Sequence, residues 1–192
     1  GTGGMLLGAV AHVRERGGDP RTFYGKLFGQ EKNLTTSSVA RMNLLLHGLN
    51  APAIEYGNSL AVKITELGPG DQVDVILTNP PFGGEEEAGI RNNFPADKQT
   101  SETALLFLQL IMRRLRKPRA GSDRVGRAAV VVPNGLLSAP GVAARIRVEL
   151  LTEFNVTSIV RLPHNVFAPY TDIKTNLMFF DRSGPTSSIL YC

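Results

Sequence analysis

The chain has few of the residues that build disulfides or cysteine-based metal sites, and it has no long apolar run. Its one cysteine is Cys192, the last residue, which excludes a disulfide framework and a cysteine-rich zinc site within the chain. No apolar run approaches the roughly 20 residues that cross a bilayer, and the start lacks the charged-then-apolar order of a signal peptide. We therefore expect an intracellular, cytoplasmic protein without membrane association.

The net charge is low, and the chain has only three histidines. The formal net charge is only +4, which permits a polyanionic partner without requiring one. The histidines are scattered without ligand spacing, so no metal site is expected. The densest basic run, RRLRKPR at residues 113–119, is more typical of a solvated helix C-terminus, where cations suit the helix dipole, than of a phosphate-binding surface.

Apolar residues are abundant and alternate between two spacings along the chain. Segments with helical spacing are separated by short apolar runs that are typical of strands. Helices are expected at residues 5–16, 34–48, 101–117 and 142–154, and strands at 26–31, 53–60, 72–79, 127–135, 156–163 and 175–182. This alternation predicts an α/β domain with a doubly wound, largely parallel sheet. In the third helix, Ser101 is the expected N-cap residue and Pro118 the stop.

The two ends of the sequence are unusual. It begins with GTGG rather than methionine, and it ends with SILYC, which resembles the middle of a strand. We therefore expect residues 1–192 to be a single domain that is truncated at both ends.

Polar residues follow several of the expected strands. Glu31, Asn58, Asn79, Asn134 and Pro163 each lie just past or at a strand end. Because ligands of doubly wound sheets bind outside the carboxyl ends of the strands, these residues are expected to converge on one edge.

A glycine-rich segment precedes the first helix. In GTGGML (residues 1–6), the glycines would let the backbone approach a ligand at the helix N-terminus. Glu31 ends the next strand about 27 residues later, near the spacing at which dinucleotide folds place an acid on a ribose. The alternative is an exposed strand-end acid; the glycines beside it favour the ribose role.

Residues 76–84 read ILTNPPFGG, and a plain turn does not need Pro-Pro-Phe. An amino group conjugated to an aromatic ring, as in adenine, is a poor nucleophile. The Asn79 side-chain oxygen and the Pro80 carbonyl are two acceptors for its two hydrogens, and Pro80 and Pro81 would hold them in a fixed geometry. Phe82 offers a π face to the ring. The pattern predicts attack by a planar amino nitrogen on an electrophilic carbon, without a strong general base.

These motifs occur together in a known family. The chain resembles adenine-N6 DNA methyltransferases that use S-adenosylmethionine, and within them the modification subunits of type I restriction systems. The motifs that carry the resemblance are GTGGML (1–6), GQE (29–31), ARMNLLLHG (40–48), ILTNPPFGG (76–84) and VFAPYTDIKTNLMFF (166–180). The resemblance covers essentially the whole chain. It implies a Rossmann-like methyltransferase fold with an antiparallel last strand, whose first strand is missing from the sequence.

The resemblance also implies roles in cofactor binding. Glu31 would hold the ribose hydroxyls of S-adenosylmethionine. Asn58 stands where the family usually has an aspartate that contacts the cofactor's adenine, and its neutral amide is expected to weaken binding. The remaining cofactor residues would be Gly1, Thr2, Gly3, Gly4 and Asn79.

The target adenine would meet a second set of residues. Asn79–Phe82 would clamp its amino group and ring, and Phe167 would be the second stacking aromatic, with Tyr170 as the runner-up. Strand-end packing is the alternative for both aromatic residues. The implied partners are DNA, into whose duplex the enzyme must reach by flipping the base, and the specificity and restriction subunits of a type I system.

Two other functions remain open from the sequence. Methylation of RNA adenine or of a protein glutamine amide also fits an Asn-Pro-Pro-aromatic loop, although residues 40–48 and 166–180 favour DNA. A non-catalytic partner subunit that keeps the fold is the third interpretation. The isolated chain is expected to be inactive, because the missing strand would leave the cofactor floor incomplete.

Overall fold

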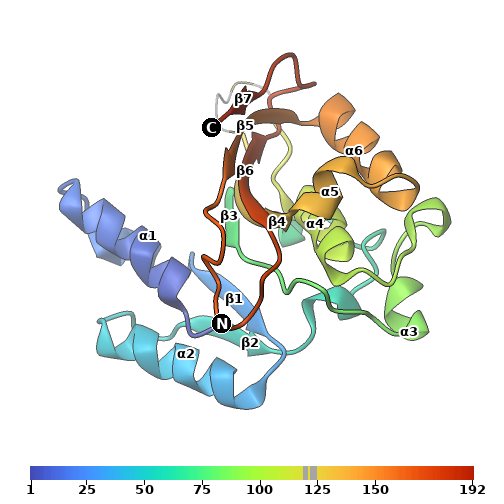
Figure 1. Cartoon of the computed structure of the whole chain (residues 1–192). Coiled ribbons are helices and arrows are strands. Elements are labelled where there is room, and N and C mark those ends of the chain that lie inside the picture. The colour runs from blue at the N-terminus through green and yellow to red at the C-terminus, as the bar shows by residue number, and fades with distance from the viewer. Residues whose placement is uncertain (119–120, 122–124) are drawn as a thin grey trace. The chain divides into compact units, whose positions relative to one another are not determined.

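The structure is a computed structural model, and it describes residues 1–118, 121 and 125–192. Arg119, the last residue of the basic run, lies outside these ranges. The chain divides into two compact units, Gly1–Ala61 and Val62–Cys192 (Figure 1). The expectation of a single domain over residues 1–192 stays a prediction.

The first unit contains two α-helices, two short 3₁₀-helices (labelled η) and a two-stranded parallel sheet. Its elements are α1 (Gly4–Glu15), η1 (Pro20–Phe23), β1 (Phe28–Glu31), α2 (Leu34–Leu46), β2 (Ala53–Tyr56) and η2 (Ser59–Ala61). Strands β1 and β2 pair in parallel, with Glu31 opposite Tyr56 at their carboxyl ends. The small buried core of this unit consists of Val10, Ala40, Leu44, Leu49 and Ile54.

The second unit contains a five-stranded mixed sheet in the order β3-β4-β6-β5-β7. Its strands are β3 (Val75–Thr78), β4 (Arg127–Pro133), β5 (Asn155–Arg161), β6 (Thr175–Asp181) and β7 (Leu190–Tyr191). Its helices are η3 (Pro69–Asp71), α3 (Ala88–Arg91), η4 (Ala96–Lys98), α4 (Thr103–Arg114), α5 (Asn134–Ser138) and α6 (Val142–Glu153). Strand β6 is antiparallel to both β4 and β5, whereas β3 pairs with β4, and β7 with β5, in parallel.

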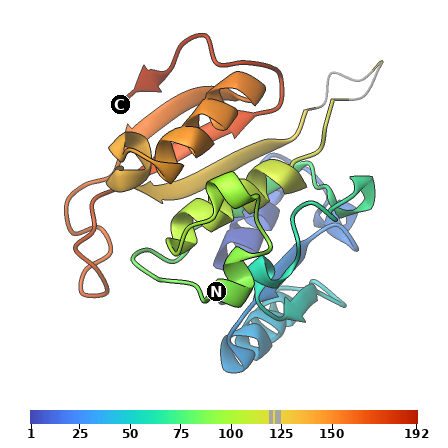
Figure 2. The same ribbon diagram turned by 90° about the vertical axis from the view of Figure 1, so that its right-hand side faces the viewer.

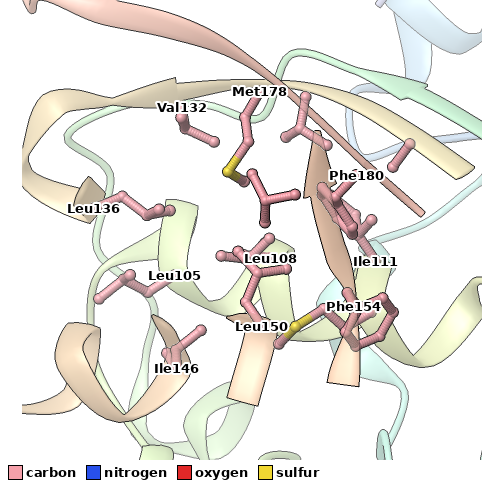
Figure 3. Packing of buried hydrophobic residues seen from close by; sticks show 14 of the residues in the cluster. Leu105, Leu108, Ile111, Val132, Leu136, Ile146, Leu150, Phe154, Met178 and Phe180 are labelled. Carbon is pink, nitrogen blue, oxygen red and sulfur yellow. The ribbon is translucent and has the colours of Figure 1, made fainter. Parts of the chain in front are cut away.

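The main core lies between one face of this sheet and helices α4, α5 and α6, which stand in front of the strands in Figure 2. Alternate residues of β4 and β6 point into it, because successive side chains of a strand face opposite sides. Figure 3 shows Val132, Met178 and Phe180 from the sheet meeting Leu108 and other helix residues. On the other face, Val75 and Leu77 of β3 remain 47% and 44% exposed.

The α/β class and the antiparallel direction of the strand at residues 175–182 are confirmed. The sheet is mixed: β3, β4, β5 and β7 run in one direction, and β6, which lies between β4 and β5, runs in the other. The strands form two sheets, and the helices that pack on the larger sheet within its unit all cover one face, where a doubly wound sheet would be covered on both.

The third helix was predicted with wrong ends. It begins at Thr103, not after a cap at Ser101, because residues 101–103 run beside residues 84–86 and form an antiparallel bridge between Glu85 and Glu102. It stops at Arg114, before Pro118, because the chain there leaves the helix to pair with Val73. No helix within the described ranges has the length and apolarity to cross a membrane.

Within the described residues the basic run is only partly solvated, since Arg113 is exposed but Arg114 is half-buried with a buried Nε. Arg113 and Arg114 occupy the last turn of α4. The Arg116 side chain donates to the Asp74 carboxylate at 2.6 Å and to the Gln72 carbonyl at 2.9 Å. Arg116 is therefore held by its own chain.

Candidate active site

The Asn79 loop (residues 79–84) leaves the carboxyl end of strand β3. Thr78, the last residue of β3, pairs with Val130 of β4. Strand β4 runs on to Pro133, and Asn134 follows it as the first residue of α5. Since β3, β4 and β5 run in the same direction, Asn79, Asn134 and Pro163 lie at the same edge of the sheet. The predicted convergence is confirmed for these three residues.

The two acceptors of the Asn79 loop, the Asn79 side-chain oxygen and the Pro80 carbonyl, have no hydrogen-bond partner among the residues that the structure describes. The Asn79 side chain is exposed, whereas Pro80 is buried and anchors the loop. Both oxygens can therefore accept hydrogens from an incoming amino group.

The two predicted stacking aromatics meet. The ring centroids of Phe82 and Phe167 are 5.6 Å apart, with the planes inclined by 51°. This is the separation of a favourable aromatic pair. Tyr170, the runner-up, is 92% exposed. Phe167 rather than Tyr170 therefore contacts Phe82, and the stacking roles of these aromatic residues stay predictions.

The Phe167 loop (residues 162–174) also approaches the Asn79 loop at a glycine. Gly83 has φ of +66°, a conformation that favours glycine. A Cβ atom at this position would lie 3.4 Å from Ile173 Cδ1. The contact of Phe82 with Phe167 joins the two loops, and Ile173 lies near Gly83, where a Cβ atom would reach it.

Asn176 is a buried asparagine at this edge of the sheet that the sequence did not identify as a site residue. Asn176 in β6 is 3% exposed, and its amide nitrogen donates to the Asn134 side-chain oxygen at 2.7 Å. Both residues line a hollow of about 380 Å³, together with Arg161 and Tyr191. The signal was one amide within the apolar run TNLMFF, and its pairing with Asn134 depends on β4 and β6 being neighbours.

The predicted cofactor residues of the first unit come together. Gly3 is the N-cap of α1 with φ of 84°, and the Thr2 carbonyl accepts from the Asn43 side chain at 3.0 Å. The amino group of Gly1 donates to the Glu31 carboxylate. The glycine segment, α2 and the end of β1 thus form one cluster.

Glu31 is a carboxylate held ready to accept hydrogen bonds. Its side chain is 19% exposed, and the Asn33 backbone N–H donates to it at 2.8 Å. Burial raises the pKa of Glu31, whereas the amino group at the start of the sequence and the backbone N–H groups of Asn33 and Lys32 lower it.

Asn58 lies at the same edge of the small sheet as Glu31. Gly57, the residue before it, donates to the Glu31 carbonyl at 3.0 Å. The Asn58 side-chain oxygen already accepts from the Leu60 N–H at 3.0 Å. Because an amide oxygen has two acceptor sites, one stays available. The functional roles assigned to Asn58, Glu31 and the glycines stay predictions.

The described residues were searched for metal sites as well. In residues 1–118, 121 and 125–192, no three His, Cys, Asp or Glu side chains gather closely enough to hold a metal ion.

Known proteins resemble the chain over its whole length. The family model for N-6 DNA methylases matches residues 1–192. The methylase subunit of the type I restriction enzyme EcoEI from Escherichia coli is 45% identical over 100% of this chain and 38% of its own length. The crystal structure of a modification subunit from Vibrio vulnificus YJ016 is 58% identical with a TM-score of 0.93, covering 100% of this chain and 40% of that one.

A third relative is more distant. The crystal structure of the M protein of the type I restriction enzyme EcoKI is 32% identical with a TM-score of 0.76, over 95% of this chain and 38% of that chain. The chain thus spans about two fifths of the length of these relatives. With a family model that matches every residue and an open Asn79 loop beside its aromatic pair, the chain belongs to the N-6 DNA methylase family.

Proposed function

We propose that the protein containing this chain transfers a methyl group from S-adenosylmethionine to N6 of adenine in DNA, as the modification subunit of a type I restriction-modification system. The observation that carries the proposal is the pair of acceptors that have no partner among the described residues, the Asn79 side-chain oxygen and the Pro80 carbonyl, next to the contact between Phe82 and Phe167. The family match and the likeness to type I methylase subunits support the choice of DNA adenine.

The target base would enter the second unit at the edge formed by the Asn79 loop. In a duplex N6 is paired and stacked, so the nucleotide must flip out at a cost of a few kcal/mol. Stacking on Phe82 and Phe167 would offset part of this cost. Because the two rings already touch, a base that stacks on both must move one of them aside.

The chemistry needs position more than acid or base strength. The Asn79 oxygen and the Pro80 carbonyl would accept the two N6 hydrogens and favour the tetrahedral geometry in which the nitrogen lone pair can attack. The N6–C bond forms as the C–S bond breaks and its electron pair stays on sulfur. The methylated nitrogen then loses one proton to solvent. Fixed acceptors lower the barrier because they need no rearrangement during the step.

The residues of the first unit fit the proposed cofactor. Bound S-adenosylmethionine would supply an electrophilic methyl group on a sulfonium. The Glu31 carboxylate, at the end of β1, would accept hydrogen bonds from the ribose hydroxyls. Gly3 would let the backbone at the start of α1 approach the ligand.

Replacing Glu31 with glutamine is expected to weaken S-adenosylmethionine binding about tenfold or more. A charge-assisted hydrogen bond is roughly twice as strong as a neutral one, and the glutamine would lose that assistance. Isothermal titration calorimetry of the full-length protein measures the change. Glu55→Gln, an exposed site on the neighbouring strand β2, is the matched control and should bind normally. Equal affinities of the Glu31→Gln and wild-type proteins would remove Glu31 from the cofactor site.

The partners follow from the same proposal. The subunit would leave reading of the DNA sequence to a specificity subunit and act in one complex with a restriction subunit, in the cytoplasm where the DNA is. The likeness to type I methylase subunits supports this. The two sheets would belong to one doubly wound methyltransferase fold.

A comparison of substrates tests the proposal. The full-length protein, with its specificity subunit, is incubated with methyl-labelled S-adenosylmethionine and DNA, RNA or protein, and the labelled product is identified by mass spectrometry. We expect N6-methyladenine in DNA. Label confined to RNA adenine or protein glutamine would replace the proposed substrate, and no label with no cofactor binding would indicate a non-catalytic subunit.

A further inference from the structure

The Asn79 loop is fixed at both ends by backbone contacts with different elements. Upstream, Thr78 belongs to β3 and pairs with β4. Downstream, the Gly84 carbonyl accepts from the Thr103 N–H at 3.1 Å, and the Glu86 N–H donates to the Ser101 carbonyl at 2.9 Å. The loop therefore bridges a strand of the sheet and the start of α4.

Thr103 also fills the space beside Gly84. A Cβ atom on Gly84 would lie 3.0 Å from Thr103 Oγ1 and 3.6 Å from Thr103 Cβ. The first distance is too short for an ordinary contact, and the second is not. Thr103 is only 3% exposed and is the first residue of α4, so it has no open space into which to retreat. A side chain at position 84 would thus displace the loop rather than the helix.

Gly84 lies close in the chain to the residues that carry the two acceptor oxygens, four residues after Pro80 and five after Asn79. Pro80 and Pro81 have fixed φ angles and Phe82 rests against the Phe167 ring, so Gly83 and Gly84 are the loop residues with the freest backbone rotation. Functional groups must be held within about 0.5 Å of the productive geometry to be effective. The contact between Gly84 and Thr103 is therefore close enough in the chain to set the position of Asn79.

We propose that Thr103 is a positioning residue for methyl transfer. It determines where the downstream end of the Asn79 loop lies, and through it where Asn79 and Pro80 present their acceptor oxygens. The role is steric, since Thr103 Oγ1 has no hydrogen-bond partner among the described residues. This inference rests on the proposed function and adds to it a residue that lies outside the ILTNPPFGG motif.

A set of variants of the full-length protein separates this role from general packing. Gly84→Ala should lower kcat for DNA methylation about tenfold or more, because small misplacements of reacting groups are costly. The KM for S-adenosylmethionine should change less than about twofold, since all the predicted cofactor residues except Asn79 belong to the first unit. Thr103→Ala removes the atom that lies 3.0 Å away, so the double variant should recover kcat to the level of Thr103→Ala alone.

A second double variant is the matched control. Combining Gly84→Ala with Thr103→Val keeps both γ positions filled, and valine has little rotamer freedom at the start of a helix. It should not recover kcat. Wild-type kcat in Gly84→Ala, equal recovery with alanine and valine, or a parallel rise in the KM for the cofactor would each overturn the proposal.

Crystal structures of the wild-type and variant proteins give a readout that needs no activity. Asn79 and Phe82 should shift relative to β3 in Gly84→Ala and return in the Gly84→Ala, Thr103→Ala double variant. An unmoved loop would overturn the positioning role. An inactive wild-type protein would instead contradict the proposed function, and the structures would still decide the role of Thr103.

Discussion

Asn79→Ala is expected to lower methyl transfer to DNA at least about a hundredfold. It should leave S-adenosylmethionine binding within about twofold of wild type, because the other predicted cofactor residues, Glu31, Asn58 and Gly1–Gly4, are unchanged. Removing one pre-organised hydrogen-bonding group from a reacting centre typically costs a factor of 10² to 10³ in kcat. Asn79 is exposed and has no hydrogen-bond partner among the described residues, so its loss should not disturb the fold. Single-turnover transfer of labelled methyl groups measures the chemical step directly.

The control for this variant is another exposed asparagine of the same unit. Asn92→Ala changes the residue after helix α3, whose side chain makes no hydrogen bond among the described residues, and it should transfer methyl groups at the wild-type rate. Cofactor affinity is followed in both variants by calorimetry. If Asn79→Ala retained the wild-type single-turnover rate, the role assigned to the Asn79 oxygen would be wrong.

Phe154→Ala is expected to destabilise the protein by about 3 to 5 kcal/mol, the usual cost of removing a buried phenylalanine ring. Phe154 is fully buried and meets Phe180 edge to face, with centroids 5.8 Å apart. The Arg182 guanidinium also lies over the Phe154 ring, 4.7 Å from the ring centroid. Burial lowers the pKa of Arg182, so this cation depends on the ring and on the Met112 carbonyl for compensation.

Urea unfolding of the full-length protein, followed by circular dichroism, measures this loss. Leu151→Ala is the matched control, since Leu151 lies on the same helix α6 but is 38% exposed. It should cost about 1 kcal/mol, clearly less than the Phe154 variant, because it removes fewer atoms and more than a third of Leu151 is already exposed. Similar costs for the two variants would contradict the placement of Phe154 in the core.

The residues around the reaction could be identified from the sequence because their chemistry is local. Asn79, Pro80 and Phe82 are consecutive or nearly so, and the reason for their order does not depend on the rest of the fold. The strand before them could be recognised by its apolar run, which matches β3 in all but its first residues. The pairing of Phe82 with Phe167 needed the family resemblance, since nothing local connects these positions.

The features that the sequence could not supply are long-range contacts. Ser101 reads as a helix cap, but its backbone carbonyl is taken by Glu86, and the helix therefore starts later, at Thr103. Asn176 reads as a strand residue, and its bond to Asn134 depends on the order of β4 and β6. In each case a tertiary partner outweighs the local preference.

The position of β6 within the sheet also depends on long-range contacts, so it could not be predicted from the sequence. The run TNLMFFDR indicates a strand but contains no signal for its neighbours, and the resemblance implied only that this last strand is antiparallel. In the structure it inserts between β4 and β5, and the short strand β7 follows it beside β5. Strand order is decided by which faces pack together, which no single segment encodes.

The central claim is that the Asn79 loop clamps the amino group of a flipped adenine. The most direct measurement is a structure of the full-length protein, with its proposed specificity subunit, bound to target DNA and a non-reactive S-adenosylmethionine analogue. The account predicts that adenine N6 lies within hydrogen-bond distance of both the Asn79 side-chain oxygen and the Pro80 carbonyl, with its ring against Phe82 and Phe167. An adenine that stays stacked in the duplex, or one bound with N6 turned away from both oxygens, would contradict it.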